Sequence, residues 1–330
     1  MIRYDKKIFQ EIEVTAQISS FCGEGNVEEW HVMLHVQADG FFSKQMERLH
    51  QAESLLMGMQ EWKGVKCVAR RYFLSDSANQ YREMSLKQTD AVSVIQQPPL
   101  DGSKVALWLY LTRGMEVVQE HGTTVCQSNG YTHLWRMGMQ HPEGDSAVQT
   151  TALLDGYEES LSQFGANVAD NCIRTWFFVR DVDTHYAGLV QARKEWFTRH
   201  GLTENTHYIA STGIGGGPAD TKALVQLGAY ALKGFEPAQI RYLHAPQWLN
   251  ATHEYGVTFE RGKPKPLNME GAVKYVASEM CQVLNDHWGY AKNDCNFKSV
   301  AEIVRNTNET KINLTLNLEG SGKSNVADAV

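Results

Sequence analysis

Two arginines, a tyrosine and a run of small residues are the side chains of this sequence best suited to bind a carboxylate. Arg174 interrupts an apolar strand pattern, and Arg193 shares one face of a predicted helix with Tyr186. A guanidinium binds a carboxylate through two parallel hydrogen bonds. The run Ser211-Thr212-Gly213 adds hydroxyl groups and backbone amides that a ligand oxygen could approach closely. These six residues form the candidate substrate-binding site, and no catalytic residue is assigned.

Structural roles for the same residues stay open. Either arginine could pair with Asp181 or Asp183 and fix the turn between strand and helix, because buried charges are normally paired whatever their function. The small residues at positions 211–213 could equally form a strand end that leads into a tight glycine turn.

Other motifs give no cofactor or metal site. The run Gly215-Gly216-Gly217 is not a phosphate loop, since neither Gly-Lys-Ser/Thr nor a helix follows it. Gly322-Lys323-Ser324 ends like a nucleotide-binding loop, but Asn317 stands where that motif needs glycine. Two histidines on one strand face lack a third ligand. We therefore expect no cofactor and no metal.

The stretch from Cys172 to Pro218 predicts the elements that position the candidate site. Ile173–Val179 is β-branched and aromatic, which is typical of a buried strand. Asp181 supplies a helix-start signal, apolar residues then recur at helical spacing, and Gly201 ends the helix. A strand resumes over His207–Thr212. The sequence thus predicts a strand, a helix and a second strand around the six residues.

An offset of 105 residues relates this unit to an earlier part of the chain and predicts a duplication. Helix, strand, aspartate turn and helix follow in the same order on both sides. The offset superimposes identical residue types at six positions: Glu53 on Glu158, Leu56 on Leu161, Cys67 on Cys172, Phe73 on Phe178, Asp76 on Asp181 and Tyr81 on Tyr186.

Three further elements are expected from local pattern. Alternating apolar residues predict a strand over Ile8–Ile18, and Asp76–Lys87 suits a short helix. Helical spacing also recurs over Val273–His287. The tail from Gly320 is rich in glycine, serine and asparagine and is expected to be flexible.

Composition narrows the function and the compartment. The 330 residues suit two or three domains. A formal net charge of −7 disfavours nucleic acid as the main partner, because phosphate binding needs clustered lysine and arginine. No apolar run reaches the roughly 18 residues of a membrane span. The six cysteines form no C-x-x-C pair and indicate reduced thiols in a cytoplasmic protein.

The residues around the candidate site resemble those of the Rid superfamily, also called YjgF or endoribonuclease L-PSP-like. A later motif, Tyr255-Gly-Val-Thr-Phe259, together with the Ala210–Gly215 segment, is similar to the chorismatases, which are multidomain relatives. The residues that carry the Rid likeness are Arg174-Thr-Trp176, Asp181, Tyr186, Trp196-Phe197 and Ala210-Ser-Thr-Gly213.

The resemblance implies an α+β fold of repeated Rid/chorismate-mutase-like modules, each a mixed β-sheet backed by two helices on one face. We expect a first module over residues 1–115 and a second over 116–235. Residues 236–330 would form an incomplete or diverged third module with a flexible tail. The resemblance also implies a homo-oligomer, or a pseudo-trimer within one chain, because symmetric closure is favoured over an open chain.

Two departures leave the activity open. The deaminases of this superfamily grip the substrate carboxylate with an arginine that falls here on Ala210 and near Asp90. Their water-handling glutamate falls on Gln226 and near Ala106, and the chorismatase motifs expected after Gly262 are missing. The sequence therefore predicts a small carboxylate-bearing metabolite at a module interface. The protein either hydrolyses an imine, an enamine or a chorismate-type enol ether, or is a catalytically silent binding or assembly protein.

Overall fold

The computed structural model describes residues 2–23, 27–84, 86, 90–203 and 205–240, and the backbone of 300–306, 311–317 and 326–329. The chain divides into two compact units, Met1–Tyr242 and Leu243–Val330. The first unit contains both large sheets and every residue of the candidate site. The helix expected over Val273–His287 lies outside the described residues.

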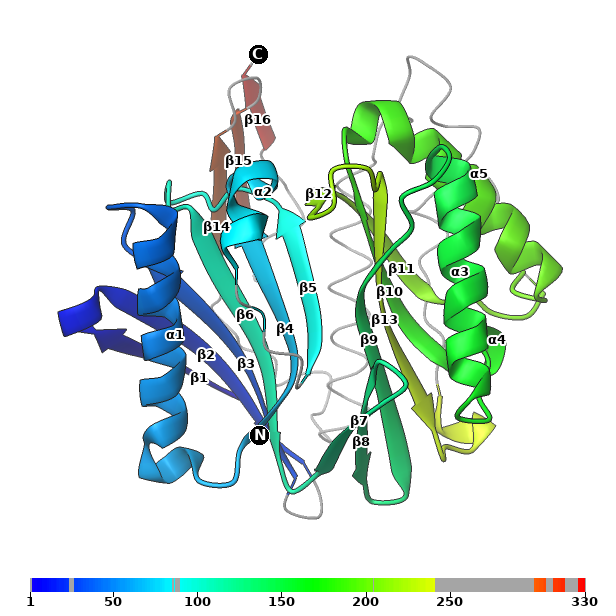
Figure 1. Ribbon diagram of the computed structural model, residues 1–330, viewed down its shortest axis with the longest axis horizontal. Helices are drawn as coiled ribbons and strands as arrows, with labels where there is room; N and C mark the ends of the chain where they lie inside the picture. The colour runs from blue at the N-terminus through cyan, green and yellow to red at the C-terminus, as the bar shows by residue number, and fades with distance from the viewer. Residues whose placement is uncertain are drawn as a thin grey trace. The chain divides into compact units, whose positions relative to one another are not determined.

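The first sheet has seven strands in the order β1-β2-β3-β6-β4-β5-β12. Strands β4 and β5 are parallel, and the other neighbouring strands are antiparallel, so the sheet is mixed. Helix α1 (Phe42–Gly58) packs on one face of it (Figure 1). The strands are β1 (Ile2–Phe9), β2 (Val14–Cys22), β3 (Glu28–Val36), β4 (Lys66–Leu74), β5 (Ala91–Gln96), β6 (Val105–Arg113) and β12 (Gly217–Pro218).

The second sheet has six strands in the order β11-β10-β13-β9-β8-β7. Strands β10 and β11 are parallel, and helices α3 (Ser146–Ser162) and α5 (Val182–Arg199) pack together on one side of this sheet (Figure 1). The strands are β7 (Glu116–Glu120), β8 (Thr123–Ser128), β9 (Tyr131–Gln140), β10 (Cys172–Val179), β11 (Ala210–Gly215) and β13 (Val225–Lys233), and a short helix α4 (Val168–Asn171) precedes β10.

The two sheets share one strand order. Read from β7, the second sheet has the order β7-β8-β9-β13-β10-β11, which matches β1-β2-β3-β6-β4-β5 of the first sheet strand for strand. The first sheet differs only by the added β12. The local irregularities agree as well, because the register shifts between Cys67 and Ala69 in β4 and between Cys172 and Arg174 in β10. Each of these thiols donates to the carbonyl two residues on, at 3.6 and 3.8 Å. The predicted α+β class with repeated mixed sheets is confirmed.

Helices α1 and α5 each bury an apolar face. In α1 the face includes Met46, Leu49 and Leu56, which join one core with the first sheet. In α5 it includes Leu189, Val190 and the fully buried Trp196, whose indole N–H donates to Asp155 Oδ1 of α3 at 2.7 Å. These contacts hold α5, and with it Tyr186 and Arg193 of the predicted site, against the sheet.

Two local predictions were wrong. The expected strand Ile8–Ile18 is interrupted by a 3-10 turn at Gln10–Ile12, after which Glu13 adopts φ 53° and the chain reverses into β2. The helix expected over Asp76–Lys87 is a single turn, α2 (Ser77–Gln80), followed by a 3-10 turn, η4 (Tyr81–Glu83). That segment has no apolar stripe at helical spacing, so no packing surface extends the helix. The remaining 3-10 turns are η3 (Gln60–Trp62) and η5 (Pro237–Gln239).

The second compact unit contributes three described strands. These are β14 (Val300–Asn306), β15 (Lys311–Asn317) and β16 (Val326–Ala329), which form an antiparallel sheet in that order. Strand β16 lies in the tail that was expected to be flexible. Among the described residues, no helix combines the length and the apolar character needed to cross a membrane.

Candidate functional site

Four of the six predicted site residues lie on the side of the second sheet that α5 covers. Arg193 of α5 is buried, and its Nη1 donates to Ser211 Oγ at 3.0 Å. The Tyr186 ring lies directly against Gly213, where a Cβ would come within 2.3 Å of Tyr186 Cε2. The glycine is therefore required for α5 to approach β11 this closely, which gives it a packing role.

The other two lie on the opposite side of the same sheet. Arg174 of β10 donates through Nη2 to Thr212 Oγ1 of β11, and its guanidinium sits 5.4 Å from the Trp176 ring centre. Strand residues alternate between faces, so the consecutive Ser211 and Thr212 point in opposite directions. The six residues consequently form two groups with the sheet between them, and the two arginines cannot grip one small molecule together. Whether either group binds a ligand stays a prediction.

The two modules meet along a seam formed by β5 of the first and by β9, β12 and β13 of the second. Ser93 of β5 donates to Gln226 Oε1 of β13 at 2.5 Å, and Gln226 Nε2 donates to Val94 O at 3.0 Å. Both Ser93 and Gln226 are buried. A Cβ on Gly138 would lie 2.3 Å from Val92 O, so the two backbones touch there. This part of the seam is closed.

The glycine run after β11 also has its place in the seam. Gly217 and Pro218 form β12, which pairs with Gln96 and Ile95 and so adds a strand of the second module to the sheet of the first. A Cβ on Gly216 would lie 3.3 Å from Phe178 and 3.5 Å from Gln96 O. Small residues are needed here because two strands approach closely, which agrees with the conclusion that the run is not a phosphate loop.

A cavity of about 320 Å³ opens beside β12 and is lined by both modules. The first module contributes Gln96, Gln97 and Pro98, and the second contributes Val179–Val182 and Gly215–Gly217. Helix α5 begins at this cavity, so its first backbone amides and its positive dipole end lie at the rim. Gln97 Nε2 donates to Gly215 O at 3.3 Å across the seam.

Arg180 is the cation of this cavity. Its Nε and Nη2 donate to the carbonyls of Ala223, Pro218 and Asp220 at 3.2, 2.8 and 3.2 Å. Among the described residues no carboxylate lies within ion-pair distance of it. The neighbouring Asp181 is the single carboxylate among the described lining residues, and it holds the left-handed conformation at φ 44°. The cavity thus offers a guanidinium, side-chain amides and helix amides to an anion.

On the sides that α1, α3 and α5 leave uncovered, the two sheets carry a set of aromatic rings, which we call the open face. Trp135 stacks on Trp176 and Tyr230 at 6.2 and 4.6 Å between ring centres, and Tyr110 of the first module tilts against Trp135 at 4.8 Å. His31 stacks on Trp108 at 5.7 Å. The rings cross from one module to the other, so the open face belongs to both.

Burial holds most titratable groups of the open face in their neutral forms. It lowers the pKa of His31 and His133, an effect that the Glu29 carboxylate partly opposes. It raises the pKa of Tyr110, whose hydroxyl donates to Glu29 at 2.5 Å, and raises the pKa of Cys126 to about 12. Formal charge on this face is therefore carried by glutamate and arginine side chains.

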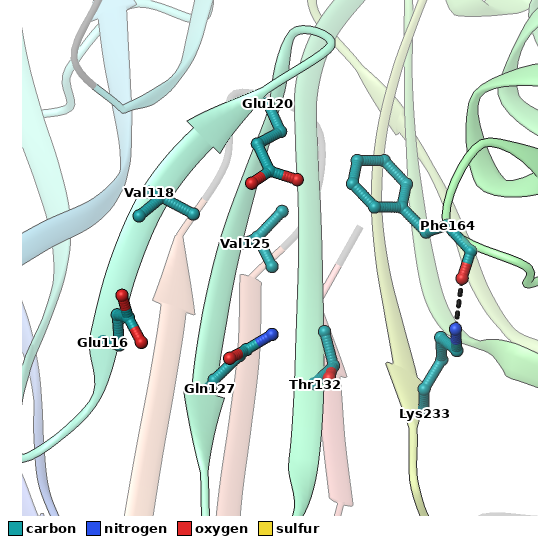
Figure 2. Close-up of a pocket in the computed structure, with 8 residues that line it drawn as sticks. All are labelled: Glu116, Val118, Glu120, Val125, Gln127, Thr132, Phe164 and Lys233. Atoms are coloured by element: carbon teal, nitrogen blue, oxygen red, sulfur yellow. Dashed lines mark hydrogen bonds between the residues drawn. The ribbon is translucent and has the colours of Figure 1, made fainter.

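A second cavity, of about 280 Å³, lies entirely within the second module (Figure 2). Figure 2 shows Glu116, Val118 and Glu120 of β7 on one side, and Lys233, which donates to Phe164 O, on the other. Val125, Gln127 and Thr132 complete its lining. Its position away from the seam separates it from the module-interface site that the sequence predicts.

Sequence reasoning missed Gln97 and Arg180, which are far apart in the chain and come together only across the seam. It named Gln226 only as the position of an absent glutamate. Arg180 had a local signal, because it stands between a buried strand and the aspartate that starts α5, a position where loops of α/β units bind ligands. Gln97 had none, since only the pairing of β5 with β12 brings it to the cavity.

No family model matches the chain, and no curated protein matches it. Solved structures do. A chorismatase is 16% identical, with 54% of this chain and 52% of that one covered and a TM-score of 0.38. A member of the YjgF protein family from Neisseria meningitidis is 19% identical, with 37% and 98% covered and a TM-score of 0.30.

A structure described as a putative translation initiation inhibitor from Salmonella typhimurium is 15% identical, with 36% of this chain and 96% of that one covered and a TM-score of 0.29. The chorismatase match spans about half of each chain, whereas the YjgF-type matches span about one third of this one. The solved structures similar to this chain thus include the two kinds of protein, YjgF-type and chorismatase, that its residues resemble.

Proposed function

We propose that the protein binds a small carboxylate-bearing metabolite in the seam cavity between its two modules. The observation that carries the proposal is the cavity itself, which both modules line and in which Arg180 meets the N-terminus of α5. A helix N-terminus and a guanidinium favour an anion at the same place. The volume of about 320 Å³ suits a small metabolite.

Binding without turnover is the function we favour. Gln226 stands where the resemblance places a glutamate, and its amide is occupied on both sides, by Ser93 and by Val94 O. An amide does not exchange protons as a carboxylate does, so this position cannot act as an acid or a base. The homo-oligomer or pseudo-trimer implied by the resemblance is part of the proposal, and light scattering of the purified chain tests it.

Hydrolysis of an imine, an enamine or an enol ether is the second candidate. Asp181 favours it, because this exposed carboxylate lines the cavity and could activate a water molecule. The assay measures turnover of 2-aminoacrylate and of chorismate by the wild type, with Asp181→Asn and Arg193→Ala as comparisons. We expect no turnover. Turnover that Asp181→Asn abolishes would replace the binding function with the enzymatic one.

The binding proposal is tested by titrating pyruvate and malate calorimetrically into the full chain. We expect at least one of these carboxylates to bind, and Arg180→Gln to weaken it at least tenfold. Val182→Phe, which fills the cavity and leaves the hydrogen bonds of Arg180 in place, should weaken it similarly. Arg199→Gln, an exposed arginine at the other end of α5, is the matched control. Equal affinity in the wild type and both cavity variants would refute the proposal.

A further inference from the structure

Arg71 is a buried arginine on the open face, away from the seam cavity. It belongs to β4 of the first module and is 8% exposed. Its guanidinium carbon lies 5.6 Å from the ring centre of Trp108 and, across the module boundary, 5.7 and 4.6 Å from those of Trp176 and Phe178. Arg71 thus sits among aromatic rings that both modules supply.

The charge of Arg71 lacks an anionic partner in the described part of the chain. Its hydrogen bonds to described residues are weak ones, from Nε to Ser93 Oγ at 3.4 Å and from Nη2 to Met137 Sδ at 4.0 Å. Burial without a nearby carboxylate lowers its pKa to about 10. Buried arginines normally find a carboxylate or phosphate, because an unpaired guanidinium loses its hydration without compensation.

The residue before it makes the contrast clear. Arg70 points to the other face of β4 and meets two carboxylates, Asp90 at 2.6 Å and Glu53 at 3.2 Å. Arg113 also lies against a tryptophan ring, at 5.3 Å from Trp30, yet it donates to Glu28 at 2.6 Å. Arg113 therefore keeps a carboxylate partner although it also contacts an aromatic ring.

The indoles beside Arg71 offer surface to a ligand, whereas the β13 side is closely packed. A Cβ on Gly228 of β13 would come within 3.5 Å of Arg71 Nη2 and 3.1 Å of Met137 Sδ. Trp108 and Trp176 are both half-buried, so part of each indole remains accessible. An accessible indole beside a guanidinium can stack on a planar group while the guanidinium binds its acid.

We propose that Arg71 is the carboxylate-binding group of a second site, which takes a planar aromatic carboxylate whose ring lies against Trp176. This site goes beyond the proposed function, since none of the residues that line the seam cavity belongs to it. It requires the two modules together, because Arg71 and Trp176 come from different sheets. An alternative occupant, a carboxylate without a ring, would use Arg71 alone.

The test uses the full chain and follows tryptophan fluorescence during titration with 2-naphthoate. Two analogues separate the contributions of ring and acid to the affinity. Cyclohexanecarboxylate lacks the aromatic ring, and 2-naphthalenemethanol lacks the carboxylate. We expect 2-naphthoate to bind at least tenfold more tightly than either analogue. Arg71→Met should reduce its affinity at least tenfold, and Arg71→Lys should reduce it less. Trp176→Leu should weaken 2-naphthoate but leave cyclohexanecarboxylate unchanged.

Matched controls keep the outcome unambiguous. Arg113→Met removes an arginine that also contacts a tryptophan and should leave the affinity for 2-naphthoate unchanged. Arg180→Gln should leave the affinity for 2-naphthoate unchanged too. The proposal for the seam cavity and the proposal for the Arg71 site can therefore fail independently of each other. If Arg71→Met unfolds the protein, Arg71→Lys decides instead. Unchanged affinity in the Arg71 variants, or equal affinity for 2-naphthoate and 2-naphthalenemethanol, would overturn the proposal.

Discussion

The consecutive arginines of β4, Arg70 and Arg71, show that the surroundings of a side chain determine whether it is paired with a carboxylate. Arg70 is 2% exposed and lies under α1 with Asp90 and Glu53, whose side chains are 0% and 8% exposed. The cluster also includes Tyr72, the hydroxyl of which lies 3.5 Å from Arg70 Nη1 and 3.2 Å from His50 Nε2. Such a buried set specifies packing only while every member keeps its partners.

At this scale we predict that Arg70→Met destabilises the protein by about 3–5 kcal/mol, because it leaves two carboxylates buried without a counter-charge. The free energy of unfolding from urea titration is the measurement. A triple variant, Arg70→Met with Glu53→Gln and Asp90→Asn, should recover part of the loss. A loss below about 1 kcal/mol in the single variant would mean that the carboxylates take up protons or reach solvent.

Among the elements, helix α3 is stabilised at its first turn as well as along its buried face. Asp145 precedes α3, and its Oδ1 accepts from the amides of Ala147 and Val148 at 3.0 and 2.9 Å. The two hairpin turns of the second sheet are set in the same local way. His121-Gly122 and Asn129-Gly130 all have positive φ, which a two-residue turn between twisted strands requires.

Asp145→Ala should destabilise the protein by about 1 kcal/mol, since it removes the acceptor of two helix amides and a negative charge at the positive end of the helix. Thermal unfolding followed by circular dichroism measures the change. Glu159→Ala, an exposed change near the other end of α3, should have almost no effect. Equal shifts in the two variants would contradict a capping role for Asp145.

Across the whole first unit, two modules of one strand order share a seam that is partly closed and partly hollow. The closed part contains the hydrogen bonds of Ser93 and Gln226 and the close approach at Gly138. The hollow part is the cavity beside β12. Because β12 belongs to the sheet of the first module, the seam cannot open without breaking strand pairing.

The seam should therefore couple the stabilities of the modules. Gln226→Leu leaves Ser93 Oγ and Val94 O without the amide, which costs about 1–3 kcal/mol. In a double-mutant cycle with Ser93→Ala, we expect a coupling of about 0.5–3 kcal/mol. Chemical denaturation followed by tryptophan fluorescence supplies the four free energies. Strict additivity, or separate unfolding transitions for the two modules, would show that the seam does not couple them.

The sequence by itself predicted the elements around the candidate site, and the family resemblance of its residues implied the class of the fold. Its apolar periods located β10 and α5, and the offset of 105 residues paired Cys67 with Cys172, which occupy matching register shifts in the two sheets. Local patterns suffice for such features because hydrophobic spacing and caps act within one element. The same patterns missed the turn at Gln10–Ile12, which contains neither glycine nor proline.

Only the tertiary structure decided which side chains meet. Strand alternation put Ser211 and Thr212 on opposite faces, so the six predicted residues divide into two groups. Pairing of β5 with β12 brought Gln97 to the cavity with Arg180, and facing sheets put Arg71 beside Trp176. Contacts across a seam depend on the register and twist of whole sheets, and no short stretch of sequence encodes these.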